Sequence, residues 1–284
     1  MMEAPSVVTE REYEYGDKIT TAAPTLCVQS SDTKAESPCC QRCLKPVGGI
    51  IQQLMAQTRQ YTLADLFQEG QSQDHGSSSS SCRSSVVSEL ICCGKGFESK
   101  TWLSSCCEHP VFCPHACGEV YCSKTCKDLA WKEHHRVMCV GPLSEDAPIY
   151  KFKVLTLTHG LPIFELAAKV VVMLASGKDF LPCLTAKAND VLPFWEYAAE
   201  FSENLSPCYR YEVEMQNLDE DAVDWLSVTK EAWSLLQAAL EDSKSRGQHL
   251  SKVEEYRSKD FQFFGKLVTW LDLHCMSVEH LSVC

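Results

Sequence analysis

Four pairs of cysteine and histidine residues are spaced as metal ligands are. The pairs are Cys40/Cys43, Cys113/Cys117, Cys122/Cys126 and His135/Cys139. A tight turn or one helical turn at this spacing directs two side chains toward a single tetrahedral ion. Zn²⁺ takes this geometry with thiolate and imidazole ligands. The sequence therefore predicts two zinc ions, each held by four protein side chains.

The predicted sites are closed, because protein side chains fill every ligand position and none is left for water or substrate. Closed sites of this kind stabilise a fold and do not hydrolyse a substrate. No Ser-His-Asp constellation, phosphate-binding loop or carboxylate pair stands out elsewhere in the chain. We therefore predict a structural role for the zinc and no hydrolase chemistry.

Other cysteines compete for these roles. Cys39 adjoins Cys40 and could replace it with a different spacing. The remaining rivals form two adjacent pairs, Cys92/Cys93 and Cys106/Cys107. Neighbouring cysteines do not readily bind one ion together, so we interpret these four as spare thiols, with a third, looser site as the alternative.

Two neighbouring histidines compete for the seventh ligand position. His135 stands four residues before Cys139, so both side chains would lie on one face of a helix. His134 would point about 100 degrees away. We predict that His135 is the ligand and that His134 is exposed.

Composition restricts the compartment and the partners. The chain has 284 residues, of which 45% are hydrophobic, enough for one large core or two modest ones. Eighteen cysteines without a basic and apolar leader at the N-terminus predict a reducing compartment, the nucleus or the cytoplasm. A net charge of -12 argues against direct nucleic-acid binding and favours a protein partner. The apolar stretch 167–175 is too short to span a membrane.

The segments before the second pair must hold the first pair in place. Residues 1–35 predict two short strands, and residues 47–69 predict a helix in two pieces. Residues 69–85 are Ser-rich and predict a mobile insertion. The insertion leaves 69 residues between Cys43 and Cys113. Closing a loop of that length in place of a ten-residue loop costs only about 1.7 kcal/mol, against roughly 10 kcal/mol from structural zinc.

The segments after Cys122 predict mainly helices. Ser123 is placed to cap a helix over residues 123–137, with Leu129 and Trp131 as packing residues. A nearly buried helix should end at Gly177, and it carries Phe164, Leu166, Ala167, Val170, Val171 and Leu174. A second apolar stripe contains Leu226, Trp233, Leu236 and Leu240, after the acidic run 218–224 at the expected helix start. Residues 264–268 predict a strand near the end of the chain.

The ligand order resembles a MYND zinc finger, with Tyr121 before the third pair and Trp131 in the following helix. The resemblance implies interleaved sites. Cys40, Cys43, Cys122 and Cys126 would bind one ion, and Cys113, Cys117, His135 and Cys139 would bind the other. A RING-type ubiquitin ligase also uses eight interleaved ligands, but its ligand order matches this chain less well.

The flanking segments are similar to SET-and-MYND lysine methyltransferases, including plant Trithorax-related members. The similar segments are Gly16-Asp17-Lys18-Ile19, Ala23-Pro24 and the predicted strand at 264–268. The resemblance implies an α+β fold, with a MYND-type double-zinc module inserted in a partial, split SET β-fold and followed by a mainly α-helical region. The implied divisions are SET strands at 1–38, the zinc module at 39–140 with an insertion at 44–112, helices at 141–262 and the start of the second SET half at 263–284.

Full-length members of that family transfer a methyl group from S-adenosylmethionine to a lysine of a histone or another protein. Their Gly-x-Gly loop, Asn-His-x-Cys motif and catalytic tyrosine are not found at the expected places, so we expect this chain to be catalytically incomplete. S-adenosylmethionine binding is expected only in a longer parent protein. The alternative function is a non-catalytic MYND module in transcriptional regulation, which would bind a Pro-containing peptide of a partner.

Overall fold

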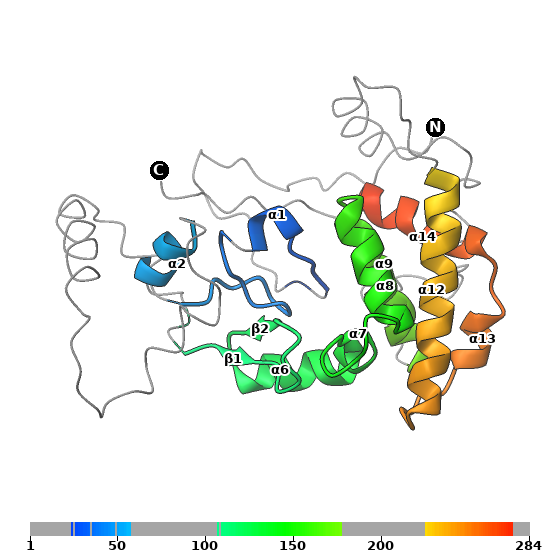
Figure 1. Ribbon diagram of the computed structural model, residues 1–284, viewed down its shortest axis with the longest axis horizontal. Helices are drawn as coiled ribbons and strands as arrows, with labels where there is room; N and C mark the ends of the chain where they lie inside the picture. Colours follow the sequence, from blue (N-terminus) through cyan, green and yellow to red (C-terminus); the bar gives the residue numbers. More distant parts are fainter. Residues whose placement is uncertain are drawn as a thin grey trace, which may run out of the picture. The chain divides into compact units, whose positions relative to one another are not determined.

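The computed structural model describes residues 24, 26–34, 36–48, 50–57, 107, 109–177 and 225–274. They form a mainly helical fold with one small sheet, and Figure 1 shows its elements in sequence colours. The expected combination of helices, a sheet and cysteine-rich clusters is therefore present. The described residues fall into two compact units. A cysteine-rich unit contains 24–132 and 139–142, and a helical unit contains 133–138 and 143–274.

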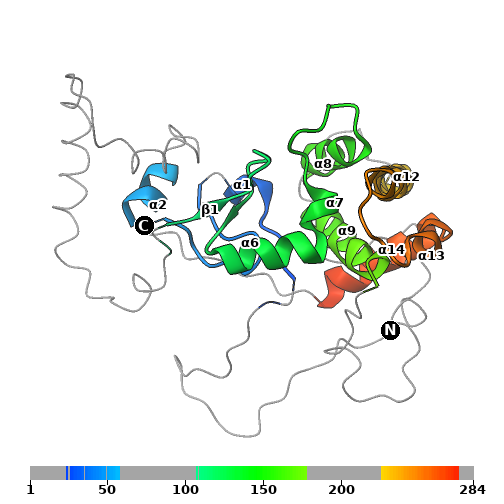
Figure 2. The ribbon, with the colours of Figure 1, turned by 90° about the horizontal axis from the view of Figure 1, so that it is seen from below.

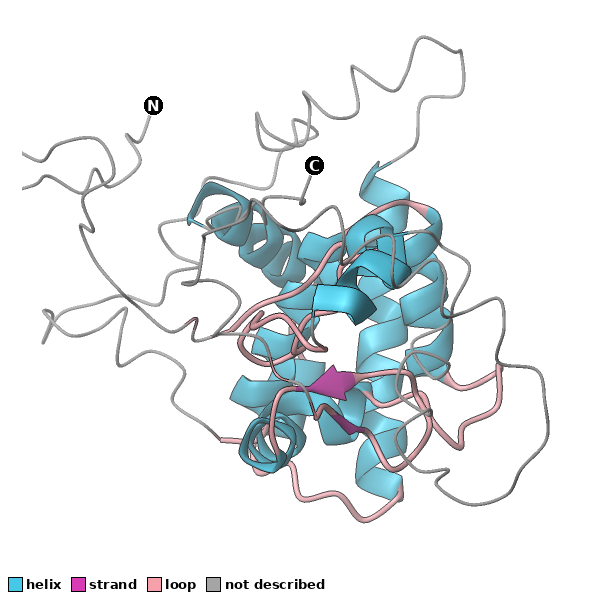
Figure 3. Ribbon diagram, turned by 90° about the vertical axis from the view of Figure 1, so that its left-hand side faces the viewer, coloured by secondary structure: helices cyan, strands magenta, loops and turns pink. Residues whose placement is uncertain are grey.

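The cysteine-rich unit is built around a short antiparallel sheet. Strand β1 (Val111–Phe112) pairs with strand β2 (Val120–Tyr121), with Val111 opposite Tyr121. Figure 3 shows the two strands side by side. The helices of this unit are α1 (Ser31–Lys34), α2 (Ile50–Gln57) and α6 (Lys124–Ala130). Helix α2 confirms the first of the two helical pieces predicted within residues 47–69.

A longer helical run follows directly from β2. Helix α6 continues as the π-helical turn η1 (Trp131–His135) and then as α7 (Arg136–Met138), a run that Figure 2 shows from below. The predicted helix over 123–137 is confirmed, although the π turn in its middle was not predicted. Leu129 was predicted to pack, but it is 40% exposed. Ala130 is buried in its place, because successive residues of a helix point about 100 degrees apart.

Five helices form most of the helical unit. They are α8 (Pro148–Thr158), α9 (Pro162–Ala175), α12 (Trp225–Ser245), α13 (Val253–Arg257) and α14 (Phe261–His274). Every residue of α9 from Leu166 to Ala175 is buried, and Gly177 follows with a φ of +74°, which confirms the predicted buried helix and its glycine end. In the predicted stripe on α12, Trp233, Leu236 and Leu240 are buried, whereas Leu226 is partly buried.

The strand predicted at residues 264–268 is wrong, because these residues lie within helix α14. The Asp260 carboxylate accepts a hydrogen bond from the backbone N–H of Phe263 at 3.2 Å and so caps the helix. Phe264, Leu267 and Leu271 are buried at helical spacing. The buried apolar side chains of this segment therefore pack along one helical face.

Several predictions concern segments outside the described residues. These segments are most of the two strands within 1–35, the second helical piece of 47–69, the Ser-rich tract 69–85, the acidic run 218–224 and the thiols Cys92, Cys93 and Cys106. The domain boundaries at residues 38, 140 and 262 also stay predictions. No helix within the described ranges combines the length and apolar character that crossing a membrane requires.

Candidate metal centre

The first ligand pair lies on a tight knuckle. The backbone N–H of Cys40 donates to the carbonyl of Lys45 at 2.8 Å, and the N–H groups of Cys43 and Leu44 donate to the carbonyl of Cys40 at 3.3 and 2.9 Å. Leu44 takes a left-handed conformation, with a φ of 56°, which turns the chain back on itself. The turn places the Cys40 and Cys43 thiols on the same side.

The second pair lies on a similar knuckle between β1 and β2. The N–H of Cys113 donates to the carbonyl of Glu119 at 3.0 Å, and the N–H of Ala116 donates to the carbonyl of Cys113 at 3.2 Å. Ala116 and Gly118 both have positive φ, at 55° and 82°. Cys113 therefore follows β1 directly, with Cys117 one turn further along the chain.

The third pair spans the start of helix α6. Cys122 follows β2 directly, and Ser123 has an extended backbone conformation at the N-cap of the helix. The Ser123 hydroxyl accepts a hydrogen bond from the backbone N–H of Cys126 at 3.1 Å, as predicted. This cap fixes the first helical turn and places Cys126 beside Cys122.

The fourth pair closes the helical run, with His135 at the end of η1 and Cys139 just after α7. His135 follows Cys126 by nine positions along the helical run, a rise on the order of 13 Å. The two side chains are therefore too far apart to share an ion. His134 was predicted to be exposed, but it is 4% exposed. It lies one turn before Val137 and Met138, which are buried on the same helical face.

The structure brings the eight predicted ligands together in two sets of four. The first set contains Cys40, Cys43, Cys122 and Cys126, and the second contains Cys113, Cys117, His135 and Cys139. Within each set the candidate ligand atoms lie within 4.8 Å of one another. This grouping is the interleaved arrangement that the family resemblance implied.

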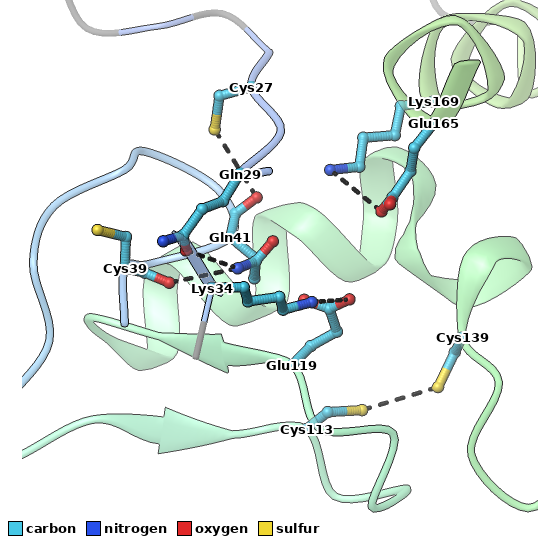
Figure 4. A network of polar contacts seen from close by, with 10 residues as sticks. All are labelled: Cys27, Gln29, Lys34, Cys39, Gln41, Cys113, Glu119, Cys139, Glu165 and Lys169. Carbon is cyan, nitrogen blue, oxygen red and sulfur yellow. Dashed lines mark hydrogen bonds and ion pairs between the residues drawn. The ribbon is translucent and has the colours of Figure 1, made fainter. Parts of the chain in front are cut away.

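The sulfur–sulfur distances fit a tetrahedral ion. Four thiolates at about 2.3 Å from Zn²⁺ would be about 3.8 Å apart at tetrahedral angles. In the first set the Sγ of Cys43 lies 3.6 Å from that of Cys122 and 3.9 Å from that of Cys126, and the last two are 3.5 Å apart. In the second set the Sγ atoms of Cys113 and Cys139 are 3.8 Å apart (Figure 4). A disulfide would need about 2.05 Å, so these distances fit a shared cation better.

The thiols of the first set influence one another strongly. A hydrogen bond from Cys43 lowers the pKa of Cys40 to about 5, and the same bond raises the pKa of Cys43. Burial raises the pKa of Cys122 to about 11. Without a cation, one buried thiolate is thus stabilised by protons that its neighbours retain. A bound Zn²⁺ would supply the positive charge that lets all four sulfurs ionise together.

In the second set, as in the first, the pKa of one thiol is lowered and the pKa of another is raised. A hydrogen bond from Cys117 lowers the pKa of the Cys139 thiol, whereas burial raises the pKa of the Cys113 thiol. Cys113, Cys139 and His135 are each at most 5% exposed. A buried group of thiols and an imidazole is a donor set that suits Zn²⁺.

The rival thiols that the structure describes do not join either set. Cys39 is fully buried, and its Sγ donates to the carbonyl of Ser37 at 3.3 Å. Cys107 is half-buried, and its Sγ donates to the carbonyl of Cys122 at 2.9 Å. Cys40 and not its neighbour Cys39 is therefore the ligand candidate, because the knuckle directs the Cys40 thiol toward the other three thiols of the first set.

An apolar cluster surrounds the sites. Its buried members other than the ligands are Val47, Val120, Tyr121 and Ala130, and Trp131 packs against them. Burial raises the pKa of the Tyr121 hydroxyl, and the nearby Glu119 carboxylate raises it further. The contact of Trp131 with this cluster confirms the predicted packing role of Trp131. Its indole ring also stacks on the exposed His115 imidazole, with ring centroids 5.0 Å apart.

Two supporting contacts had no signal in the sequence. The Lys34 ammonium lies 3.1 Å from the Glu119 carboxylate and ties α1 to the second knuckle, as Figure 4 shows. The backbone N–H of Gln41 donates to the carbonyl of Val120 at 3.0 Å and ties the first knuckle to β2. Both contacts join segments far apart in sequence, which spacing alone cannot reveal.

The arrangement can therefore hold two divalent cations that cross-link the segments of the cysteine-rich unit. Comparison of the chain with protein-family models, with curated proteins and with solved structures gave no significant match in any of the three.

Proposed function

We propose that this chain is a zinc-dependent protein-interaction module of MYND type, in which two structural zinc ions hold a recognition surface in shape. The observation that carries the proposal is the assembly of eight predicted ligands into two complete four-ligand sets. Protein side chains supply four donors to each set, so a bound ion would have no vacant position for a substrate. Such ions stabilise a fold, and the surface around them carries the function.

The surface beside the second set suits a peptide. His115 is exposed and stacks on the half-exposed Trp131 at an interplanar angle of 23°. Two further apolar side chains of the same unit reach solvent, Phe112 at 37% exposure and Leu129 at 40%. Aromatic surfaces of this kind bind Pro-containing segments, whose extended conformation costs little entropy to fix. We therefore propose a Pro-containing peptide of a partner protein as the ligand.

A peptide array tests this proposal. The zinc-loaded full chain is applied to immobilised Pro-containing peptides, and the affinities of His115→Ala and Leu129→Ala are compared with that of the wild type. We expect each variant to weaken binding at least about fivefold, a loss of about 1 kcal/mol, with unchanged zinc content. Leu157→Ala is the matched control, because Leu157 is 59% exposed on α8 of the helical unit. Binding that is indifferent to both variants, or to zinc removal, would refute the proposal.

Kinship with SET-and-MYND lysine methyltransferases is a second hypothesis, supported only by the sequence resemblance. It would make a histone or another lysine-containing protein the partner of a longer parent, in the nucleus or cytoplasm. The only sheet in the described residues has two strands, and residues 264–268 are helical. We therefore expect no binding of S-adenosylmethionine to this chain. A micromolar affinity for S-adenosylmethionine in a calorimetric titration would favour the methyltransferase hypothesis over the interaction-module hypothesis.

A further inference from the structure

The first metal set is assembled from two segments that are distant in sequence. Cys40 and Cys43 belong to one knuckle, whereas Cys122 and Cys126 begin helix α6, and Cys43 and Cys122 are 79 positions apart. Until an ion binds, other contacts must hold the two ligand pairs at the right separation. Cys107 belongs to neither metal set and contacts both segments, the first through its backbone and the second through its half-buried thiol.

Cys107 holds the first knuckle through its backbone. Its N–H donates to the carbonyl of Pro46 at 3.2 Å, and its carbonyl accepts from the N–H of Gly48 at 2.6 Å. These two bonds form a parallel bridge between Cys107 and Val47, which is fully buried. The segment that leaves the Cys40–Cys43 knuckle is thereby paired with Cys107.

Cys107 holds the other ligand pair through its side chain. Its Sγ donates a hydrogen bond of 2.9 Å to the backbone carbonyl of Cys122, a short distance for a sulfur donor. This carbonyl belongs to the peptide unit between Cys122 and the helix cap Ser123. The hydrogen bond therefore constrains the backbone from which the Cys122 thiol projects toward the first set.

The other described thiols outside the two sets are placed differently. The Cys39 thiol bonds the carbonyl of Ser37, only two residues away. The Cys27 thiol is 3.8 Å from the carbonyl of Gln41, on the first knuckle. Neither of these two hydrogen bonds reaches the segment that carries Cys122 and Cys126. Cys107 differs from them because its backbone and its side chain contact the two halves of one metal set.

We infer that Cys107 is a positioning residue of the first metal set, whose thiol hydrogen bond orients Cys122 for the cation. This inference rests on the proposed zinc binding. Groups that orient metal ligands without touching the metal commonly change its affinity about 10-fold to 100-fold. A serine hydroxyl can donate to the same carbonyl, whereas an alanine cannot. The metal affinity of the first set should therefore depend on a hydrogen-bond donor at position 107 and not on a sulfur atom there.

The test compares Cys107→Ala and Cys107→Ser in the full chain. Cadmium is titrated against a competing chelator and followed by cadmium NMR, in which an ion bound by four sulfurs and an ion bound by three sulfurs and a nitrogen resonate separately. We expect Cys107→Ala to weaken the four-sulfur site at least about 10-fold and Cys107→Ser to stay within about threefold of wild type. The mixed site should be unchanged in both variants. Cys39→Ala is the control for loss of a buried thiol, because the Cys39 thiol bonds the carbonyl of Ser37, outside the Cys40–Cys43 turn, and it should leave both sites unchanged.

Three results would overturn the inference. In the first, Cys107→Ala binds cadmium at the four-sulfur site as tightly as the wild type. In the second, Cys107→Ser is as weak as Cys107→Ala, so that the hydrogen-bond donor is not the cause. In the third, both sites weaken equally in Cys107→Ala, which would indicate general destabilisation. A wild-type chain that binds no metal at either set would refute the proposed zinc binding itself, so the two failures are distinguishable.

Discussion

Replacing Gly141 by alanine should selectively damage the second metal set. A Cβ atom at position 141 would lie 1.8 Å from the backbone oxygen of His115 and 2.6 Å from its carbonyl carbon. To reach the 3.0 Å that real contacts require, the two segments must separate by about 1.2 Å. The obstacle is backbone and not a flexible side-chain end, so it cannot simply rotate away.

Both segments that must separate carry ligands of the second set. His115 lies between Cys113 and Cys117 on the knuckle, and Gly141 is two residues beyond Cys139. The Sγ atoms of Cys113 and Cys139 are 3.8 Å apart, and metal–ligand distances tolerate deviations of only about 0.2 Å. Overpacking of this kind costs about 1–3 kcal/mol, which corresponds to about 5-fold to 150-fold weaker metal binding.

Cadmium NMR can read the two sites separately. We expect Gly141→Ala to weaken the site with three sulfurs and one nitrogen and to leave the four-sulfur site near its wild-type affinity. Gly160→Ala is the matched control, because a Cβ there would meet nothing within 4 Å and adds only the strain of a φ of +62°. If Gly141→Ala binds both ions as the wild type does, the close approach of the two segments does not exist and the reasoning fails.

Three further predictions follow from the same contacts. Ser123→Ala should lower the stability of the zinc-loaded chain by about 1 kcal/mol, and Ser123→Asp should restore it, as judged by urea unfolding, because only an oxygen acceptor can cap the Cys126 N–H. Glu119→Gln should lower the free energy of unfolding of the zinc-loaded chain by about 1 kcal/mol. The value is this small because solvent screens the ion pair at Lys34, whose side chain is one-third exposed. In a Lys34→Met background the loss should be smaller, because the ion pair is already absent. Acidification should release zinc, because protons compete for the thiolates. Zinc content by mass spectrometry should therefore fall as pH falls and recover on neutralisation.

The short-range features of the site could be predicted from sequence, because they depend on spacing within one turn. The knuckles, the Ser123 cap and the choice of His135 over His134 all follow from residues at most four positions apart. The pairing of the four ligand pairs into two ions did not follow from spacing and came only from the family resemblance. Spacing fixes which two side chains meet, and the tertiary fold fixes which two pairs meet.

Two predictions, the exposure of His134 and the strand at 264–268, were wrong for different reasons. His134 is buried because its helical face, shared with Val137 and Met138, packs inward. Residues 264–268 were predicted as a strand, yet the cap at Asp260 and the helical spacing of the buried side chains agree with a helix. That second error was avoidable, since the capping residue and the period were both visible in the sequence.

The long separation between the first and second ligand pairs allows a decisive deletion. The described chain leaves the first knuckle through Val47 and α2, and at Cys107 it pairs with Val47 again. The segment between Gln57 and Cys107 can therefore be shortened without moving either paired residue. It contains three of the rival thiols, Cys92, Cys93 and Cys106.

We expect a chain in which a 12-residue Gly/Ser linker replaces residues 58–106 to keep two zinc ions per molecule. Such a linker reaches about 40 Å when extended, and the shorter loop should stabilise the fold by about 1 kcal/mol through its lower closure entropy. Native mass spectrometry gives the zinc stoichiometry, and Cys43→Ser in the same background should remove one ion. If the linker variant itself holds fewer than two ions, the deleted segment supplies a ligand and the assignment of the eight side chains is wrong.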